Sequence, residues 1–390
     1  PGLSRKRNKR FGKGQILYEN TVMPLPQSTA SDPGCVHVPL SALKGRGSAT
    51  RMAHRFERDA REPFDDGWPQ DGQAAAPVKT RWVWEDCKSA ITRNTSPDIG
   101  FDLSINPYRG CEHGCSYCYA RPSHAYLGLS PGLDFETRLI AKRGLRDRLI
   151  QELASPRYRP GVMALGTVTD AWQPLDRELR LTREVLEVLS DCHHPVAMVT
   201  KGSGIERDID LLAGMAGRQL AGVYVTVTTL DAELARRMEP RAAAPWRRLR
   251  TIRALADAGI PVGVSVSPQI PFLNDDMEQV LEAARDEGAR SAFYVLLRLP
   301  WELSPLFRQW LALHYPQRAE RVMARMHDLR GGRDYDASFD NRRSGQGLWA
   351  QLLAQRFAKA CARLGLNRER HAWNLADFRP PSRSRQMDLF

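Results

Sequence analysis

The sequence predicts an α/β fold: a partial (β/α)6 barrel of the TIM type, set between a disordered basic N-terminal segment and a helical C-terminal extension. From about Asp98 onward, short apolar runs alternate with amphipathic stretches. Runs such as VYVTVT and VGVSV are rich in apolar and β-branched residues, which is typical of strands covered on both faces. Six βα units in a row imply a parallel sheet with right-handed crossovers, and six are too few to close an eight-stranded barrel.

The elements can be placed from these patterns. The six strands are expected at residues 102–107, 162–167, 196–200, 222–228, 262–267 and 291–296. The helices between them are expected at 136–154, 176–192, 205–216, 231–238 with 246–258, and 275–287. Asp176, Asp231 and Asn274 stand at positions expected of helix N-caps. In such a sheet, the functional residues are expected at the carboxyl ends of the strands.

Both ends of the chain differ in character from this core. Residues 1–75 are rich in Gly, Pro, Ser, Arg and Lys without sustained periodicity, and we expect them to be mostly disordered. Within them, the stretch 44–57 (KGRGSATRMAHRFE) either docks on the body or a partner, or is a solvated basic linker. The remaining organisation is expected to be a lead-in at 76–97, a core at 98–300, a helical extension at 301–380 and a tail at 381–390.

The composition is that of a basic globular protein, with 57 Lys and Arg against 45 Asp and Glu and a net charge of +12. This charge favours a polyanionic partner such as nucleic acid, through phosphate contacts and counterion release. The alternative to a polyanionic partner is that the protein is basic but otherwise an ordinary soluble protein. No run of eighteen apolar residues occurs, and no apolar segment follows the basic N-terminus, so neither a membrane span nor a secretory signal is expected. We therefore expect a cytoplasmic protein without a membrane partner.

Three of the seven cysteines form the strongest functional signal. The total is odd and the spacing uneven, which argues against a disulfide framework. Cys111, Cys115 and Cys118 follow the first expected strand directly. Thiolates are the preferred ligands of iron–sulfur clusters, and three this close can reach three corners of one cubane. With no fourth cysteine nearby, one iron would keep an open position for a substrate, as catalytic metal sites do.

A zinc site is the alternative for these cysteines, with His113 or His124 as a fourth ligand. Zinc ligands usually come as paired C-x2-C units, and the sequence has no second pair. The remaining cysteines are scattered, so a second cluster is not expected.

The C-x3-C-x2-C spacing, with an aromatic residue before the last cysteine, resembles the signature of radical SAM enzymes. In that family the open iron binds S-adenosyl-L-methionine (SAM), and one electron from the reduced cluster gives methionine and a 5′-deoxyadenosyl radical that abstracts hydrogen from a substrate. The resemblance implies a [4Fe–4S] cluster and SAM as cofactors, and a reduced flavodoxin or ferredoxin-type electron donor. It also places Tyr117 near the adenine.

Further motifs resemble the spore photoproduct lyase-like subgroup of that family, over about residues 98–365. They occur at successive strand ends, as segments 106–120 (NPYRGCEHGCSYCYA), 166–174 (GTVTDAWQP), 199–203 (VTKGS), 238–240 (MEP) and 267–271 (SPQIP). By position, the resemblance implies SAM contacts in four places: the methionine part at Thr169 and Asp170, the carboxylate at Lys201, the ribose at Thr228 and Glu239, and the adenine at Ser267 and Pro268.

Two of these residues also have plainer interpretations. Lys201 could be a solvated lysine at a strand end, and Glu239 could pair with Arg236 or Arg241. No catalytic residue beyond the cofactor ligands is assigned.

The chain also departs from the photoproduct lyases. They are expected to carry a cysteine hydrogen donor near the end of the second strand, where this chain has Gly166, Thr167, Val168 and Thr169. Cys192 falls at a helix end and is expected to be a small buried residue. Repair of the spore thymine dimer is therefore not implied, and the substrate does not carry over.

The last printed residues, Gln386, Met387, Asp388, Leu389 and Phe390, resemble the pentapeptide by which bacterial DNA polymerases and repair proteins bind the sliding clamp. In such a peptide the apolar side chains fill pockets while the glutamine forms hydrogen bonds. Packing of the tail on the body is the alternative.

Three functions therefore remain open. The first is a radical SAM enzyme acting on nucleic acid, in repair or modification. The second is a radical SAM enzyme acting on a protein or small molecule. The third is a non-enzymatic metal-binding protein associated with DNA.

Overall fold

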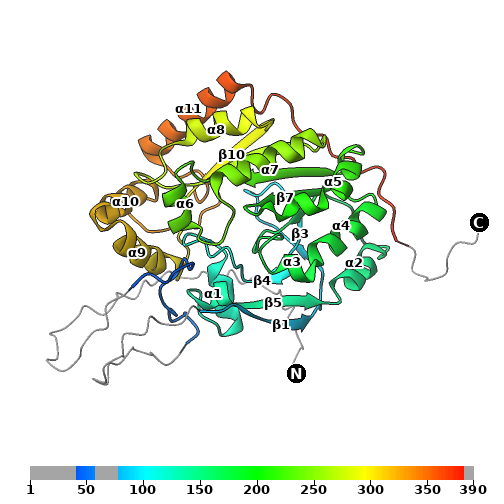
Figure 1. The fold of residues 1–390 in the computed structure, drawn as a ribbon, viewed down its shortest axis with the longest axis horizontal. Coiled ribbons are helices and arrows are strands. Elements are labelled where there is room, and N and C mark those ends of the chain that lie inside the picture. Colours follow the sequence, from blue (N-terminus) through cyan, green and yellow to red (C-terminus); the bar gives the residue numbers. More distant parts are fainter. Residues whose placement is uncertain (1–40, 58–77, 382–390) are drawn as a thin grey trace, which may run out of the picture. The chain divides into compact units, whose positions relative to one another are not determined.

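A parallel sheet forms the centre of the fold in a computed structural model that describes residues 41–57 and 78–381 (Figure 1). Its strands run in the order β10-β9-β8-β7-β6-β3-β2, and every neighbouring pair is parallel except β2 and β3. The strands are β2 (Ile91–Arg93), β3 (Leu103–Ile105), β6 (Met163–Leu165), β7 (Val196–Thr200), β8 (Ala221–Thr226), β9 (Val262–Gln269) and β10 (Ser291–Leu296). All six predicted strands are present as neighbours in sequence order, which confirms the predicted partial barrel.

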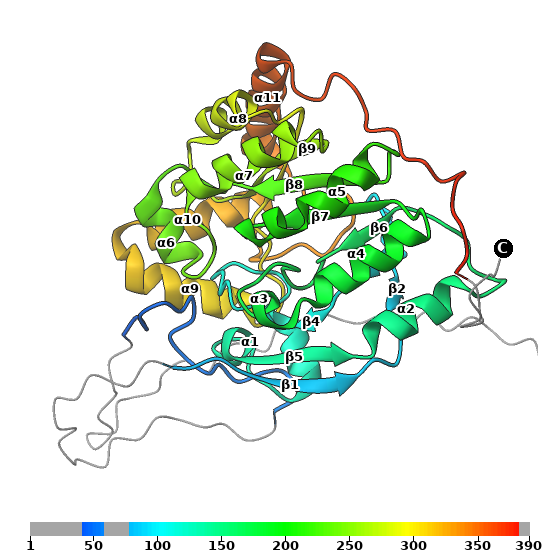
Figure 2. The ribbon, with the colours of Figure 1, turned by 45° about the vertical axis from the view of Figure 1, so that its right-hand side comes forward.

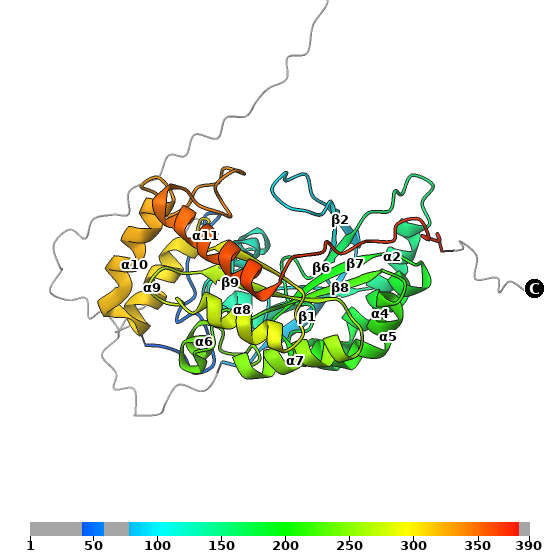
Figure 3. The same ribbon diagram turned by 90° about the horizontal axis from the view of Figure 1, so that it is seen from above.

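Helices connect these strands along the outer side of the sheet (Figure 3). They are α2 (Leu145–Leu153), α3 (Asp176–Leu179), α4 (Leu181–Asp191), α5 (Ile209–Ala216), α6 (Ala232–Met238), α7 (Pro245–Asp257) and α8 (Met277–Asp286). The helix predicted at 176–192 is interrupted at Arg180, whose φ of 54° lies in the left-handed region. The first residues of the helix predicted at 205–216 belong to a 3-10 helix, Ser203–Asp208.

Only one of the three predicted N-caps is an N-cap. The Asp231 carboxylate accepts hydrogen bonds from the backbone N–H groups of Glu233 and Leu234, at 2.8 and 3.1 Å. Asp176 instead lies within α3, where its buried carboxylate accepts the hydroxyl of Tyr108 at 2.6 Å. Asn274 lies in the loop before α8, and its side-chain amide donates hydrogen bonds at the ends of β8 and β9.

A second sheet accounts for the main error in the predicted elements. It contains β1 (Arg81–Asp86), β5 (Arg138–Arg143) and β4 (Tyr108–Arg109) in that order, with β1 and β5 parallel and side by side in Figures 1 and 2. The helix predicted at 136–154 is therefore wrong over β5, which separates the short helix α1 (Asp134–Thr137) from α2. Because β4 ends two residues before Cys111, this sheet anchors the start of the cysteine loop.

The chain after β10 is mainly helical, as predicted. Its helices are α9 (Leu303–His314), α10 (Pro316–Leu329) and α11 (Gly347–Leu364). The segment between α10 and α11 returns to the sheet, where the backbone N–H of Leu296 donates to the carbonyl of Arg343 at 2.9 Å. Across the two described ranges, no helix is both long and apolar enough to cross a membrane.

Residues 41–57 pack on the body, so of the two alternatives for 44–57 the structure shows docking on the body and not a solvated linker. The Arg55 guanidinium pairs with both carboxylate oxygens of Glu302, at 2.9 and 2.7 Å. The Arg46 side chain is buried and donates to the carbonyl of Glu136 at 3.2 Å. The other residues of the predicted N-terminal segment lie outside the described ranges.

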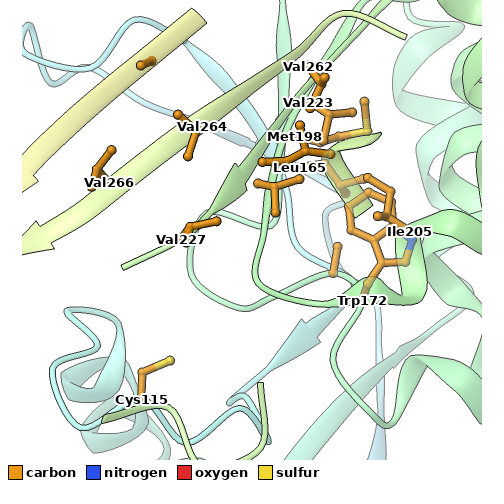
Figure 4. Packing of buried hydrophobic residues seen from close by; sticks show 14 of the residues in the cluster. Cys115, Leu165, Trp172, Met198, Ile205, Val223, Val227, Val262, Val264 and Val266 are labelled. Carbon is orange, nitrogen blue, oxygen red and sulfur yellow. The ribbon is translucent and has the colours of Figure 1, made fainter. Parts of the chain in front are cut away.

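The core between sheet and helices gives the strand ends a rigid base. Met198, Val223 and Val262 come from three neighbouring strands and gather beside Trp172 and Ile205 (Figure 4). Each is at most 3% exposed. Burying such an apolar side chain stabilises the fold by roughly 1.5–3 kcal/mol. The loops that follow these strands therefore start from fixed positions.

Candidate functional site

The three cysteines occupy one tight loop after β3. Gly110 and Gly114 have φ values of +79° and +66°, which favour glycine and let the loop turn sharply. Cys111 and Cys115 are buried and Cys118 is partly buried. Burial raises the pKa of the Cys111 thiol and raises that of Cys115 to about 12. The loop thus presents three sulfur atoms from eight consecutive residues, in a setting largely closed to water.

A buried ion pair holds the back of this loop. The Arg121 guanidinium donates to the carbonyls of Cys115 and Gly114, at 2.8 and 2.9 Å, and pairs with Glu136 at 2.6 Å. The other oxygen of Glu136 accepts the backbone N–H of Gly47 at 3.0 Å. A Cβ at Gly47 would lie 1.7 Å from the carbonyl oxygen of Gly114, so only glycine permits this approach. The docked N-terminal stretch is therefore part of the wall that shapes the cysteine loop.

The end of β6 holds the front of the loop. The hydroxyl of Thr169 donates to the carbonyl of Gly110 at 2.6 Å. The Gln173 amide donates to the Thr169 hydroxyl at 2.9 Å and accepts the backbone N–H of Glu112 at 2.8 Å. The Thr169 side chain therefore positions the cysteine loop by a hydrogen bond to a backbone carbonyl of that loop.

Asp170 links three parts of the site. Its carboxylate accepts the hydroxyl of Thr200 and the backbone N–H of Lys201, both at 2.8 Å, and lies 3.3 Å from His113 Nδ1. Burial alone would raise the pKa of this carboxyl, but His113 and these hydrogen bonds lower it to about 2. Asp170 is therefore ionised and fully engaged, and it fixes the end of β7 against the cysteine loop.

A second buried ion pair lies under Tyr117. The carboxylate of Glu239 accepts the hydroxyls of Tyr117 and, at 2.6 Å, of Thr228. Its other oxygen pairs with Arg248, which is also buried. Glu239 thus pairs with an arginine of α7 and not with Arg236, and Thr228 and Tyr117 share its first oxygen.

Lys201 is the cation at the centre of the site. Its ammonium lies 5.7 Å from the centroid of the Tyr117 ring. Burial alone would lower the pKa of this ammonium, but its electrostatic interactions with Cys115 and Glu239 raise the pKa above its usual value. The nearby carboxylate Glu112 pairs with Arg241, and Glu239 pairs with Arg248. Within the described residues, the Lys201 ammonium thus has no carboxylate partner.

The end of β9 leaves a buried hydroxyl without a partner. In the two described ranges, the Ser267 hydroxyl oxygen is buried and forms no hydrogen bond. The Asn274 amide donates to the carbonyls of Thr228 and Pro268, both at 2.9 Å, and so joins the ends of β8 and β9. Since an unsatisfied buried polar group is costly, the Ser267 hydroxyl is suited to a ligand group.

The donor set fits a three-cysteine cluster better than a zinc ion. His113 Nδ1 faces Asp170, and His124 Nε2 lies 3.0 Å from the carbonyl of Arg138. Among the residues with described positions, no three His, Cys, Asp or Glu side chains could hold one metal ion. A cubane needs no such convergence, because each thiolate binds a different iron.

The structure therefore brings together every predicted site residue that it describes, on the ends of consecutive strands and the loop after β3. Arg121, Glu136, Gly47, Gln173 and Arg248 also belong to the site but were not predicted. Gln173 stood within a quoted motif, whereas the others had no signal in the sequence. The tail residues 386–390 lie outside the described ranges.

Comparison with known proteins agrees with this geometry. The Radical SAM superfamily model matches residues 105–284. The uncharacterized protein Rv2578c of Mycobacterium tuberculosis is 34% identical over 239 residues, which cover 60% of this chain and 70% of that protein. The uncharacterized protein MJ0683 of Methanocaldococcus jannaschii is 26% identical over 223 residues, covering 57% and 80%.

The fold agrees with that of a solved enzyme. Spore photoproduct lyase complexed with dinucleoside spore photoproduct superposes with a TM-score of 0.51 at 14% identity, covering 73% of this chain and 80% of that one. The chain therefore belongs to the radical SAM superfamily, whose enzymes use a [4Fe–4S] cluster and S-adenosylmethionine, and it shares its fold with spore photoproduct lyase.

Proposed function

We propose that Cys111, Cys115 and Cys118 hold the [4Fe–4S] cluster and that SAM binds at the iron without a cysteine ligand. When bound, the reduced cluster supplies the electron that cleaves SAM to methionine and a 5′-deoxyadenosyl radical. The observation that carries this proposal is the cysteine loop itself. Arg121 and Thr169 both hold its backbone through hydrogen bonds to loop carbonyls. Lys201, a cation that pairs with no carboxylate of the described residues, lies in the same site.

The side chains around the loop divide into two groups in this proposal. Lys201 pairs with the SAM carboxylate, because this half-buried cation has no carboxylate partner among the described residues, whereas Arg241 and Arg248 pair with Glu112 and Glu239. Ser267 offers a hydroxyl beside Pro268, where the adenine is expected. By contrast, Asp170 and Glu239 have both carboxylate oxygens occupied, so we assign them positioning roles. Glu239 holds Thr228 and Tyr117 in place.

We further propose that the substrate is a nucleic acid. Two observations support this: the net charge of +12, and the likeness in fold to a lyase that binds a dinucleoside. Repair of the spore thymine dimer is not proposed, because residues 166–169 at the end of β6 contain no cysteine. The second candidate is a protein or small-molecule substrate. The finding that nucleic acids neither bind to the enzyme nor react would favour it.

Two partners belong to the same proposal. A reduced flavodoxin or ferredoxin-type protein delivers the electron. The residues from Gln386 to Phe390 bind the sliding clamp, on the strength of their sequence alone. Deletion of these five residues should abolish clamp binding in a pull-down, and unchanged binding would favour an incidental tail.

Iron and sulfide analysis of anaerobically purified protein tests the cluster. We expect about four irons and four sulfides per chain in the wild type. Cys111→Ala, Cys115→Ala and Cys118→Ala should each lose them, whereas Cys192→Ala should keep them. Cys192 is a matched control because it is also buried, at 3% exposure, but ends α4. Zinc without iron and sulfide would overturn the proposal and favour the non-enzymatic alternative.

A further inference from the structure

Arg298 stands at the carboxyl end of β10, next to the cysteine loop, and pairs with no carboxylate of the described residues. Arg298 lies two residues beyond β10, and its guanidinium is 5.0 Å from the centroid of the Tyr119 ring. Tyr119 directly follows Cys118, and its hydroxyl donates to the carbonyl of Thr167 at the end of β6. Arg298 therefore contacts the residue next to Cys118, at the same edge of the sheet as the other site residues.

Within the described ranges, no carboxylate forms an ion pair with Arg298. In the described part of the chain, its Nε is buried and forms no hydrogen bond. Two further arginines, Arg330 and Arg343, lie close to Arg298. Burial, together with the charge of Arg298, lowers the pKa of Arg330 to about 10. The same two causes lower the pKa of Arg343. Two carboxylates lie near these arginines: Asp98, which pairs with Arg342 at 2.6 Å, and Asp336, which lies near Arg330. Grouped cations of this kind repel one another and are suited to an added anion.

A group of exposed aromatic rings includes Trp301, which follows Arg298 by three residues in the sequence. Trp301, Tyr126 and Phe56 are 63%, 69% and 53% exposed. They come from the loop after β10, from the 3-10 helix after the cysteine loop, and from the docked N-terminal stretch. A contiguous group of large, solvent-exposed apolar side chains usually marks a binding surface.

Arg55 holds these rings together. Its guanidinium lies 4.5 to 5.0 Å from the centroids of all three rings and is tied to Glu302 by two hydrogen bonds. Trp301 also has a φ of 47°, in the left-handed region that a bulky residue rarely adopts. Such strain is typical of residues held in place for a function. The rings are thus fixed in position with much of their surface in solvent.

We propose that Arg298 and the rings of Trp301, Tyr126 and Phe56 form a subsite for a single-stranded or unpaired segment of nucleic acid beside the reacting nucleotide. Arg298 binds a phosphate of the strand, and the rings stack on its bases. This deepens the proposed nucleic-acid function and rests on it. Rings and cations in alternation are how proteins bind single strands.

Anisotropy titration of a labelled single-stranded oligonucleotide with the reconstituted enzyme tests the subsite. Trp301→Ala should weaken binding about tenfold or more. Arg298→Gln should lower the slope of log affinity against log salt by about 0.7. The controls are Trp246→Ala and Arg250→Gln on α7, where the tryptophan is 58% exposed and also lies beside an arginine, at 5.9 Å. Both controls should bind as the wild type does.

The outcomes separate the subsite from the function on which it rests. If the wild type binds the oligonucleotide but Trp301→Ala and Arg298→Gln bind no differently from the controls, the subsite is wrong and the nucleic-acid function stands. If the wild type forms 5′-deoxyadenosine but binds no oligonucleotide, both are wrong. Competition by polyglutamate as strong as by unlabelled oligonucleotide would also overturn the subsite, because it would show a general anion surface. If Trp301→Ala does not fold, the salt slope of Arg298→Gln still decides the matter.

Discussion

The Arg121 guanidinium and the Glu136 carboxylate form an ion pair with 2.6 Å between Nη2 and Oε1, and neither side chain is exposed to solvent. Through this pair the cysteine loop, the 3-10 helix after it and the docked N-terminal stretch are held as one piece. Removal of one partner leaves a buried charge without compensation, which costs much more than the loss of a surface pair.

Glu136→Ala should therefore destabilise the protein by about 3–5 kcal/mol in urea unfolding. The control is Glu187→Ala, because Glu187 is about two-fifths exposed and its partners Arg146 and Arg183, at 2.9 and 3.4 Å, are also partly exposed. That variant should cost about 1 kcal/mol or less. Equal costs for the two variants would contradict the role given to the buried pair.

Asp170→Ala should lower the affinity of the cysteine loop for iron. The change removes the acceptor for His113, Thr200 and the backbone of Lys201, so the cysteine loop loses its tie to the end of β7. Loss of a residue that orients metal ligands typically costs about tenfold or more in metal affinity. Iron retained against a chelator measures the effect, with exposed Asp210→Ala as control. Retention equal to that of the control would show that Asp170 does not position the loop.

Lys201→Met should weaken SAM binding by about tenfold or more, because a charge-assisted contact contributes roughly 1.5–3 kcal/mol. Equilibrium dialysis of the reconstituted enzyme with labelled SAM measures this, while iron content shows that the cluster is intact. Lys359→Met on α11 is the control, because that lysine is exposed and distant in the sequence. Unchanged affinity in Lys201→Met would mean that another group binds the carboxylate.

The free energy of unfolding should decrease as the pH is lowered from about 6.5 to about 4. Burial lowers the pKa of His194 to about 4, so the unfolded chain binds a proton in this window while the native protein does not. The loss from one such histidine is at most about 3 kcal/mol. His194→Gln keeps a hydrogen-bonding group for Tyr158, which lies at 2.6 Å, and should remove part of the pH dependence. Only part is removed, because burial lowers the pKa of His124 to about 4 as well. Urea midpoints at pH 7 and 4.5 that change equally in both proteins would contradict this account.

The sheet and its edge could be predicted because their signals are local. The bounds of β7 and β10 agree with the apolar runs that predicted them, and the cysteine spacing identified the loop after β3. Successive strands of a parallel sheet end at one edge, so the order of motifs along the chain also predicted that Asp170, Lys201 and Ser267 would meet.

The errors arose where partners lie far apart in the sequence. Leu139 and Ala141 are buried in β5, but this strand forms between β1 and β4, whose partner residues lie more than fifty and about thirty residues earlier in the sequence. Without these partners, the short pattern of β5 could not be separated from the helices on either side. Glu239 pairs with Arg248 and not with Arg241, because α7 returns over the end of β8 and brings a later arginine to the site. Nothing local marks such a buried pair.

The formation of 5′-deoxyadenosine from SAM tests the central claim most directly. The anaerobically reconstituted enzyme is reduced with dithionite, given SAM and assayed for this product, with Cys115→Ala and Cys192→Ala in parallel. We predict product from the wild type and from Cys192→Ala, and none from Cys115→Ala. A wild type that carries iron and sulfide in full and binds SAM, yet forms no 5′-deoxyadenosine with nucleic acid present, would contradict the proposal that this site cleaves SAM.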